Sequence, residues 1–110
     1  MTTLSSHALD LVRGLPAVGL QIRLFHESDL LVDHKTDRNG RWGPFPLIDG
    51  IKIYKLEVEI GQYFISKRTK LNTDHIFTSF DINVDVDDNC KHLHIPILLS
   101  PSGFTFYRGC

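Results

Sequence analysis

The chain has 110 residues, with 12 basic and 13 acidic side chains, and hydrophobic residues make up 42% of it. This composition is typical of a globular protein, and we expect residues 1–110 to form a single domain. The near-zero net charge argues against partners such as nucleic acid or an anionic membrane, which are bound through an excess of basic side chains.

The dominant hydrophobic period along the chain is two, which is typical of β-strands that bury one face. Gly, Pro and Asn-Gly signals separate the periodic runs into turns. Gly43–Pro46 is expected to be irregular, and Gln62–Lys70 is expected to form one short helix. The predicted strands are Ser6–Val12, Gly19–His26, Leu30–Lys35, Ile51–Ile60, Thr78–Val86, His92–Ser100 and Phe104–Tyr107.

Seven or eight strands at these spacings predict an all-β fold, an antiparallel sandwich of two sheets. The last two predicted strands flank Pro101–Gly103 and should form a closing hairpin. The chain has no internal repeat and no low-complexity segment, so nothing in it indicates a second domain.

Two cysteines, Cys90 and Cys110, form no CxxC pair, and free thiols are expected rather than a disulfide. The first seven residues lack the basic start and apolar run of a secretion signal. The C-terminus is not the Ser-Lys-Leu peroxisomal signal, and no apolar run approaches the roughly 20 residues of a membrane span. These features together predict a cytoplasmic location.

Histidines are the first candidates for chemistry. His92 and His94 stand two apart on a predicted strand, so their side chains leave the same face. His7 lies on another predicted strand. The pattern allows three interpretations: histidines that are only hydrogen-bonded in the fold, a zinc site with an open fourth position, or acid–base chemistry without metal.

Arginines near turns are the second candidates. Arg41 follows the Asn-Gly turn directly, and it is either a solvated loop cation or a planar double donor for an oxyanion. Arg108, near the C-terminus, has the same two interpretations. Tyr107 is either a phenolic donor or an aromatic side chain at the rim of a site.

Four motifs occur in order along the whole chain, and together they resemble the transthyretin-like 5-hydroxyisourate hydrolases. Their agreement in order and spacing runs from end to end, and the first and last motifs are specific. The motifs are Leu4–Asp10 followed by Gly14–Ala17, Thr36–Arg41, Gly61–Phe64, and His92–Pro101 with the ending Tyr107–Cys110.

The resemblance implies a two-sheet sandwich of the transthyretin (prealbumin) type with one short helix. It also implies a homotetramer with sites in the channel where dimers meet. The implied activity is hydrolysis of the small molecule 5-hydroxyisourate to 2-oxo-4-hydroxy-4-carboxy-5-ureidoimidazoline in urate breakdown, with no cofactor and no metal.

The resemblance also implies roles for particular residues. His7, Arg41 and His94 match the catalytic group of the family, and His92 is expected to give structural support. Residues expected to bind substrate are His7, Arg41, Tyr107, Arg108, Gly109 and Cys110. The family ends in Tyr-Arg-Gly-Ser, whereas this chain ends in Cys110, whose thiol is a weaker hydrogen-bonding group than a hydroxyl. We expect a mild effect, because the preceding tripeptide is intact.

Other functions are weighed against the metal-free hydrolase. A small-ligand carrier like transthyretin would share the fold, but it needs an apolar channel, and the candidate residues are polar. A zinc hydrolase would use His7, His92 and His94 as ligands. A β-sandwich interaction module would have no site at all, and fold alone does not separate these functions.

Overall fold

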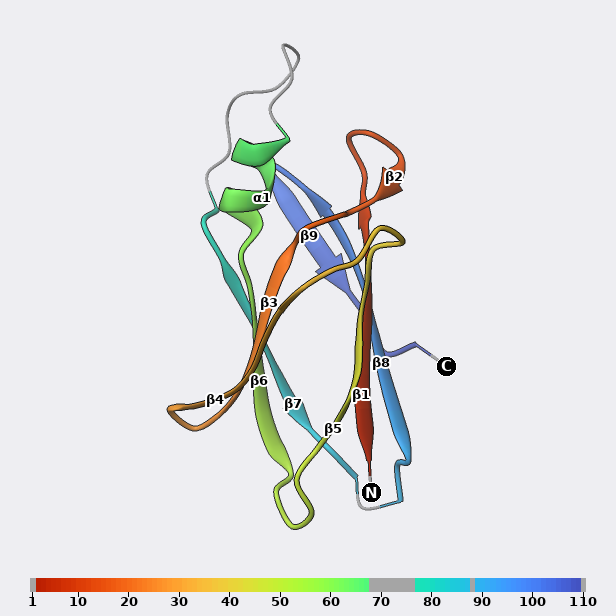
Figure 1. Cartoon of the computed structure of the whole chain (residues 1–110), viewed down its shortest axis with the longest axis vertical. Helices are drawn as coiled ribbons and strands as arrows, with labels where there is room; N and C mark the ends of the chain where they lie inside the picture. The colour runs from red at the N-terminus through yellow and green to blue at the C-terminus, as the bar shows by residue number, and fades with distance from the viewer. Residues whose placement is uncertain (1, 68–76, 88, 110) are drawn as a thin grey trace.

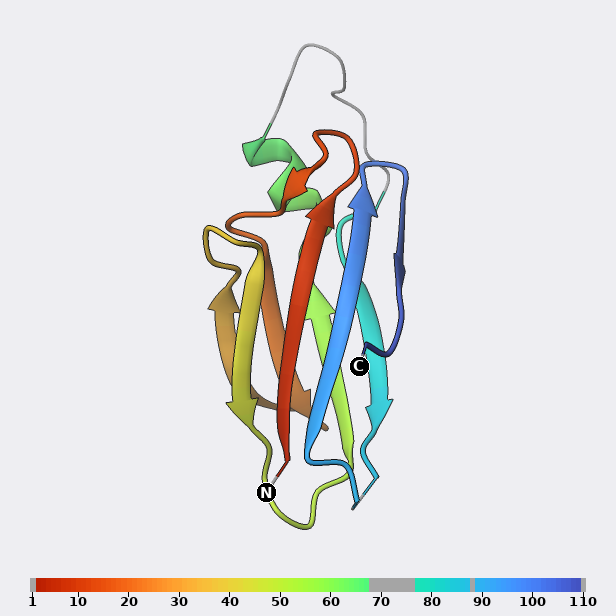
Figure 2. The same cartoon turned by 90° about the vertical axis from the view of Figure 1, so that its right-hand side faces the viewer.

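The structure is a computed structural model that describes residues 2–67, 77–87 and 89–109. In this part of the chain, two β-sheets face each other (Figures 1 and 2). The first contains β1 (Thr3–Asp10), β2 (Leu15–Pro16), β5 (Arg41–Pro46), β8 (His92–Ser100) and β9 (Gly103–Phe106). The second contains β3 (Gln21–His26), β4 (Asp29–Lys35), β6 (Ile53–Val58) and β7 (Phe80–Asp85), and the helix α1 (Ile60–Ser66) follows β6.

The strand order is β2-β1-β8-β9 in the first sheet, with β5 also paired to β1, and β4-β3-β6-β7 in the second. The predicted two-sheet sandwich with one short helix is therefore confirmed in the described residues. Among these residues, no helix is both long and apolar enough to cross a bilayer. The helix begins two residues earlier than predicted and ends at Ser66, while residues 68–70 of the predicted range lie outside the described residues.

Two expectations about strands were wrong. Gly43–Pro46 is not irregular, because it belongs to β5, which pairs with β1 from Thr3↔Pro46 to His7↔Arg41 across a bulge. Prolines are tolerated there because β5 is an edge strand and a missing N–H costs no ladder hydrogen bond on the open side. The sheets are also not wholly antiparallel, since β1 and β8 run parallel from Thr3↔His92 to Asp10↔Leu99.

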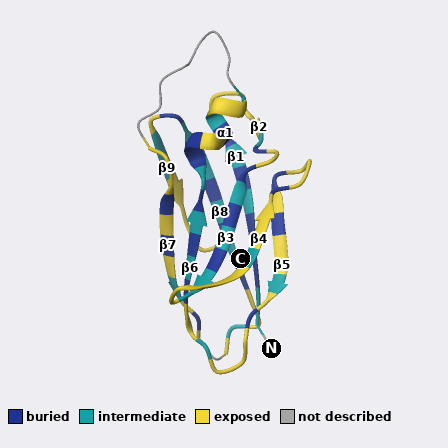
Figure 3. Ribbon diagram, turned by 60° about the vertical axis from the view of Figure 1, so that its left-hand side comes forward, coloured by how far each residue is buried: buried dark blue, intermediate teal, exposed yellow. Residues whose placement is uncertain are grey.

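The core lies between the two sheets and follows the predicted alternation (Figure 3). In β3 and β6 the inward side chains, including Ile22, Leu24 and Leu56, are almost completely buried. Trp42 of β5 is also fully buried, and its indole Nε1 donates a hydrogen bond to the backbone oxygen of Ile22 at 3.2 Å. Because Ile22 belongs to the other sheet, Trp42 ties the two layers together while its ring fills the core.

The helix is attached to the first sheet by a buried polar contact. The phenolic hydroxyl of Tyr63 in α1 donates to Asp10 Oδ2 at the end of β1, at 2.8 Å. Asp10 Oδ1 also accepts from the backbone N–H groups of Val12 and Arg13. Asp10 is wholly buried, and these three donors compensate its carboxylate for the loss of water.

Candidate functional site

One outer face of the first sheet gathers the polar side chains singled out in the sequence. β1 lies between β5 and β8, and its residues Thr3, Ser5 and His7 alternate with the residues that face the core. Side chains that pair directly across neighbouring strands lie close together on a shared face. The register pairs Thr3 with His92, Ser5 with His94, and His7 with Arg41.

The turn before β5 determines where Arg41 lies. Gly40 has a φ of +75°, and a Cβ at this position would lie 2.6 Å from the backbone oxygen of Ala8. Ala8 in turn donates its N–H to the backbone oxygen of Gly40 at 2.8 Å. Only glycine allows this close, left-handed approach to β1. The turn therefore places Arg41 opposite His7 in the pairing of β5 with β1.

A cavity of about 370 Å³ opens on this face of the sheet. The structure thus brings together the expected catalytic residues Arg41 and His94, with His92 beside them. His7 is not among the lining residues of the cavity; it lies next to Arg41 across the strand pair, and its Nε2 is 3.0 Å from the backbone oxygen of Asn39. Lining residues of the cavity include Ser5, Arg41, Pro44, His92 and His94.

The two histidines of β8 are linked through hydroxyl groups of β1. Thr3 Oγ1 lies 2.6 Å from His92 Nδ1, and His92 Nε2 lies 3.1 Å from Ser5 Oγ. Ser5 Oγ also lies 2.7 Å from His94 Nδ1. Sequence reasoning missed Thr3 and Ser5, because the predicted strand began at Ser6, whereas β1 begins at Thr3 and its alternation places both residues on the face of His7.

His94 is tuned toward its neutral form. The partial burial of His94 lowers its pKa. Nearby His92, Arg41 and His7 lower this pKa further, because positive charge on these neighbours disfavours a positive charge on His94. A neutral imidazole has one nitrogen that can accept a proton. Nδ1 is in contact with Ser5 Oγ, and this is the only side-chain hydrogen bond of His94 to a residue described in the structure. In the tautomer that carries its hydrogen on Nδ1, His94 can therefore act as a base through Nε2.

The C-terminal segment after β9 runs beside β8 (Figure 2) and reaches the candidate site at His94. Tyr107 and Gly109 donate backbone N–H groups to the backbone oxygens of Pro96 and His94, at 3.3 Å and 2.7 Å. A Cβ at Gly109 would lie 2.9 Å from His94 Cδ2, so the segment touches the imidazole ring. Gly109 therefore borders the candidate site, whereas the predicted contact of Cys110 lies outside the described residues.

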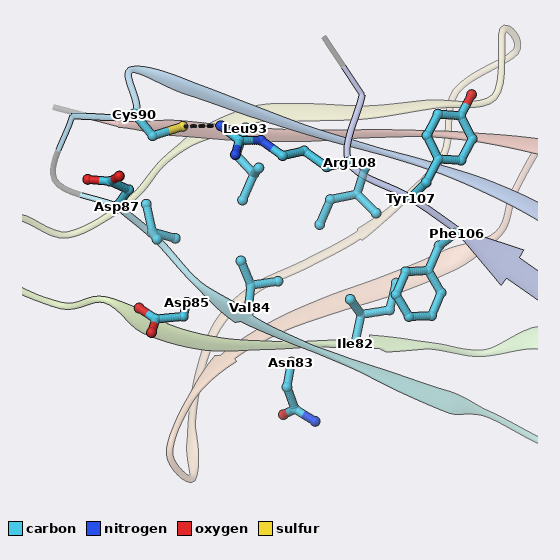
Figure 4. Close-up of a pocket in the computed structure, with 12 residues that line it drawn as sticks. Ile82, Asn83, Val84, Asp85, Asp87, Cys90, Leu93, Phe106, Tyr107 and Arg108 are labelled. Atoms are coloured by element: carbon cyan, nitrogen blue, oxygen red, sulfur yellow. Dashed lines mark hydrogen bonds between the residues drawn. The ribbon is translucent and has the colours of Figure 1, made fainter.

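Arg108 points elsewhere. Its side chain enters a second cavity, of about 300 Å³, between β7, β8 and the C-terminal segment, where its Nη2 lies 4.0 Å from Cys90 Sγ (Figure 4). This cavity is lined on β8 by Leu93 and Ile95, which alternate with the outward histidines. The structure thus does not bring Arg108 together with Arg41 and His94. Cys90 carries a free thiol, as expected.

The zinc alternative finds no support in this geometry. Among the described residues, no group of three or more His, Cys, Asp and Glu side chains is arranged to share a metal ion. His92 also has both ring nitrogens in contact with hydroxyl groups.

The fold and the polar outer face of the first sheet together define a class of protein. It is a two-sheet β-sandwich that carries histidines and an arginine on an outer sheet face. The chain belongs to the HIUase/Transthyretin family, whose model matches residues 4–109. The resemblance inferred from the motifs is therefore confirmed.

Similar proteins cover the chain almost completely. It is 35% identical to 5-hydroxyisourate hydrolase 2 of Rhizobium meliloti over 96% of this chain and 94% of that protein. It is 33% identical to the 5-hydroxyisourate hydrolase of Salmonella typhimurium over 96% of this chain and 79% of that protein.

Solved structures agree with this assignment. The 5-hydroxyisourate hydrolase of Klebsiella pneumoniae superposes with a TM-score of 0.84 at 32% identity, over 99% of this chain and 100% of that one. An (S)-allantoin synthase superposes with a TM-score of 0.81 at 28% identity, over 99% of this chain but 44% of that one. The transthyretin-like fold is thus confirmed.

Proposed function

We propose that this chain is a 5-hydroxyisourate hydrolase, a cyclic-amide hydrolase that opens its substrate to 2-oxo-4-hydroxy-4-carboxy-5-ureidoimidazoline in urate breakdown. The observation that carries the proposal is the shared cavity of Arg41 and His94, with the C-terminal segment against the His94 ring. Full-length similarity to proteins of this name supports it.

The proposed reaction uses side chains alone. His94 Nε2 takes a proton from water, and the resulting hydroxide oxygen bonds to a ring carbonyl carbon. Arg41 stabilises the negative charge that develops on the carbonyl oxygen. The ring C–N bond then breaks, and the departing nitrogen takes a proton from His7, which lies beside Arg41. The scheme requires no metal and no cofactor.

Binding of the flat substrate is assigned to the same face. We propose that Gly109 borders the bound ring, since its backbone N–H is bonded to the backbone oxygen of His94 on β8. Tyr107 lines the second cavity beside Arg108, so its binding role stays a prediction from the resemblance. Roles for Arg108 and Cys110 in binding stay predictions from the resemblance, and Arg108 would have to leave Cys90 to contact substrate.

We also propose a homotetramer with its sites where dimers meet. Arg41 is exposed in the single chain, so a second subunit could close the cavity over it. A single domain of residues 1–110 and a cytoplasmic location belong to the same proposal and rest on the sequence.

The alternative, a small-ligand carrier without hydrolase activity, is less well supported. A carrier would hold its ligand mainly by apolar contacts, whereas Arg41, His92 and His94 bring three polar side chains to this cavity.

The deciding experiment follows the absorbance of freshly prepared 5-hydroxyisourate. Because this compound also decays spontaneously, the rate is compared with no protein and with a His7→Ala/His94→Ala double variant at equal micromolar concentration. We expect wild-type protein alone to accelerate the decay strongly. Decay no faster than the spontaneous rate would refute the hydrolase.

A further inference from the structure

A single hydroxyl group bridges the two histidine rings of β8. Ser5 Oγ lies 2.7 Å from His94 Nδ1 and 3.1 Å from His92 Nε2, and the ring planes are only 17° from parallel. Ser5 is 8% exposed, so water competes little for its hydroxyl. Thr3 Oγ1 lies 2.6 Å from His92 Nδ1, so Thr3, His92, Ser5 and His94 form a continuous row of hydrogen-bonded groups.

The chemistry of a hydroxyl couples the two rings. A serine hydroxyl donates one proton and can accept another hydrogen bond. If Ser5 accepts from His94 Nδ1–H, it must donate to His92 Nε2, and His92 Nδ1–H then donates to Thr3. In the opposite direction, Ser5 donates to His94 Nδ1, which leaves the hydrogen of His94 on Nε2. The row therefore sets the tautomers of both rings together.

The surroundings of the cavity favour the arrangement in which Ser5 accepts from His94 and donates to His92. Arg41 lines the same cavity, and its guanidinium has only donors and a permanent positive charge. An N–H on His94 Nε2 would direct a second positive dipole into this space, whereas a lone pair on Nε2 is favoured by the charge. The lowered pKa of His94 agrees with a neutral ring beside this charge.

We propose that Ser5 is a positioning residue that, with His92 behind it, holds His94 as the Nδ1–H tautomer with the basic Nε2 free for catalysis. The proposal rests on the proposed function, because it explains how His94 is kept ready as the base. It also gives His92 a defined part: its Nε2 accepts the Ser5 proton, so that the Ser5 oxygen can accept from His94. No bond other than hydrogen bonds changes in this arrangement.

The first test measures turnover in variants. Ser5→Ala removes the acceptor of His94 Nδ1, and we expect kcat to fall about tenfold or more, a part of what a positioned base contributes. KM should change less than about twofold, since Ser5 acts through His94. Ser5→Thr keeps the hydroxyl and should restore most of kcat. Ser100→Ala is the control, because it deletes a serine hydroxyl bonded to a backbone oxygen at the far end of β8.

The pH profile adds a readout that a structural role would not change. Among the described residues, the titratable and charged groups that face His94 are His92 on its own strand, His7 on β1 and Arg41 on β5, and none is altered in Ser5→Ala. We expect the acid limb of the kcat profile to move in Ser5→Ala and to return to its wild-type position in Ser5→Thr. An acid limb of the kcat profile that stays at its wild-type position in Ser5→Ala would contradict the proposal.

The second test observes the tautomer directly and requires no activity. In wild-type protein labelled with ¹⁵N-histidine, the ring signals of His94, identified by their loss in His94→Gln, should show Nδ1 protonated at neutral pH. In Ser5→Ala they should move toward the Nε2–H tautomer. An Nε2–H tautomer in wild-type protein, or wild-type kcat in Ser5→Ala, would overturn the inference. Wild-type protein that shows the Nδ1–H tautomer but no hydrolysis would refute only the proposed function.

Discussion

Arg41, His94 and His7 contribute different groups to one outer face of the sheet, so their removal should affect turnover rather than folding. We expect His7→Ala, Arg41→Ala and His94→Ala each to lower kcat at least about tenfold, given that a positioned acid or base contributes roughly 10²–10⁴-fold and an oxyanion donor about 10²–10³-fold. Steady-state kinetics and thermal unfolding measure the two effects separately.

Arg38→Ala provides the matched control for the arginine. Arg38 is an exposed arginine in the same turn, three residues before Arg41, and it lines no part of the cavity. This variant should keep wild-type activity. Full activity in any two of the three site variants would contradict the assignment of the catalytic group.

The lowered pKa of His94 sets the direction of the pH dependence. A depressed pKa means that the neutral, basic form persists to lower pH than in an ordinary histidine, whose pKa is about 6.5. We therefore expect the midpoint of the acid limb of kcat to lie below pH 6.5. A pH series of kcat in buffers of constant ionic strength measures this. An acid limb with its midpoint above pH 6.5 would contradict a His94 base.

Individual site residues show what can be predicted from sequence. The motifs predicted His7, Arg41 and His94 as site residues, but they did not predict the register that pairs His7 with Arg41 and Ser5 with His94, because alternation does not reveal which strands are neighbours. The parallel pairing of β1 with β8 joins residues from opposite ends of the chain. Ser5 was missed because a serine on a strand has no distinctive signal until its partners across the sheet are known.

At the scale of elements, prolines misled the prediction of β5. Pro44 and Pro46 read as breakers of regular structure, yet they occupy an edge strand, where the ladder needs no N–H on the open side. The bulge also interrupts the period of two, since Trp42 and Phe45 are three residues apart and yet pack together with ring centroids 4.7 Å apart. Composition alone could not separate an edge strand from a loop here.

The contact between α1 and β1 makes a prediction about stability. Burial, and then the hydrogen bond to Asp10, raise the pKa of Tyr63 well above its usual value near 10. A raised pKa in the folded state gives stability that is fully present below pH 10 and is lost as pH rises toward the folded value. Tyr63→Phe should lower the free energy of unfolding by about 1.5–3 kcal/mol at pH 7, because a hydrogen bond to a charged group is lost.

Denaturant unfolding at pH 7 and above pH 10 measures both effects for Tyr63→Phe. Its decline in stability at alkaline pH should be smaller than that of the wild type, and Tyr107→Phe, which alters an exposed tyrosine, should decline as the wild type does. Equal stability of Tyr63→Phe and wild type at both pH values would mean that the buried hydrogen bond contributes nothing.

At the scale of the whole molecule, the chain leaves apolar side chains exposed where β1 leads into β3. Leu11, Val12, Leu15 and Val18 are between 37% and 52% exposed although they lie within eight residues of one another. Apolar groups gathered in this way often mark an interface between proteins. They lie at the end of the sandwich that carries α1, opposite the loop between β5 and β6 (Figure 1).

We expect this cluster to be covered in the proposed tetramer. Wild-type protein should sediment as four copies of the 12.6 kDa chain. Leu15→Glu should shift it to a smaller species, because four buried copies of a new carboxylate are costly to desolvate. Ile48→Glu is the matched control, since Ile48 is exposed to the same extent, 49%, in the loop between β5 and β6. A wild-type monomer that hydrolyses substrate would refute the tetramer and would mean that the cavity of one chain is sufficient for catalysis. If Leu15→Glu instead loses kcat together with assembly, the active sites lie at the interface.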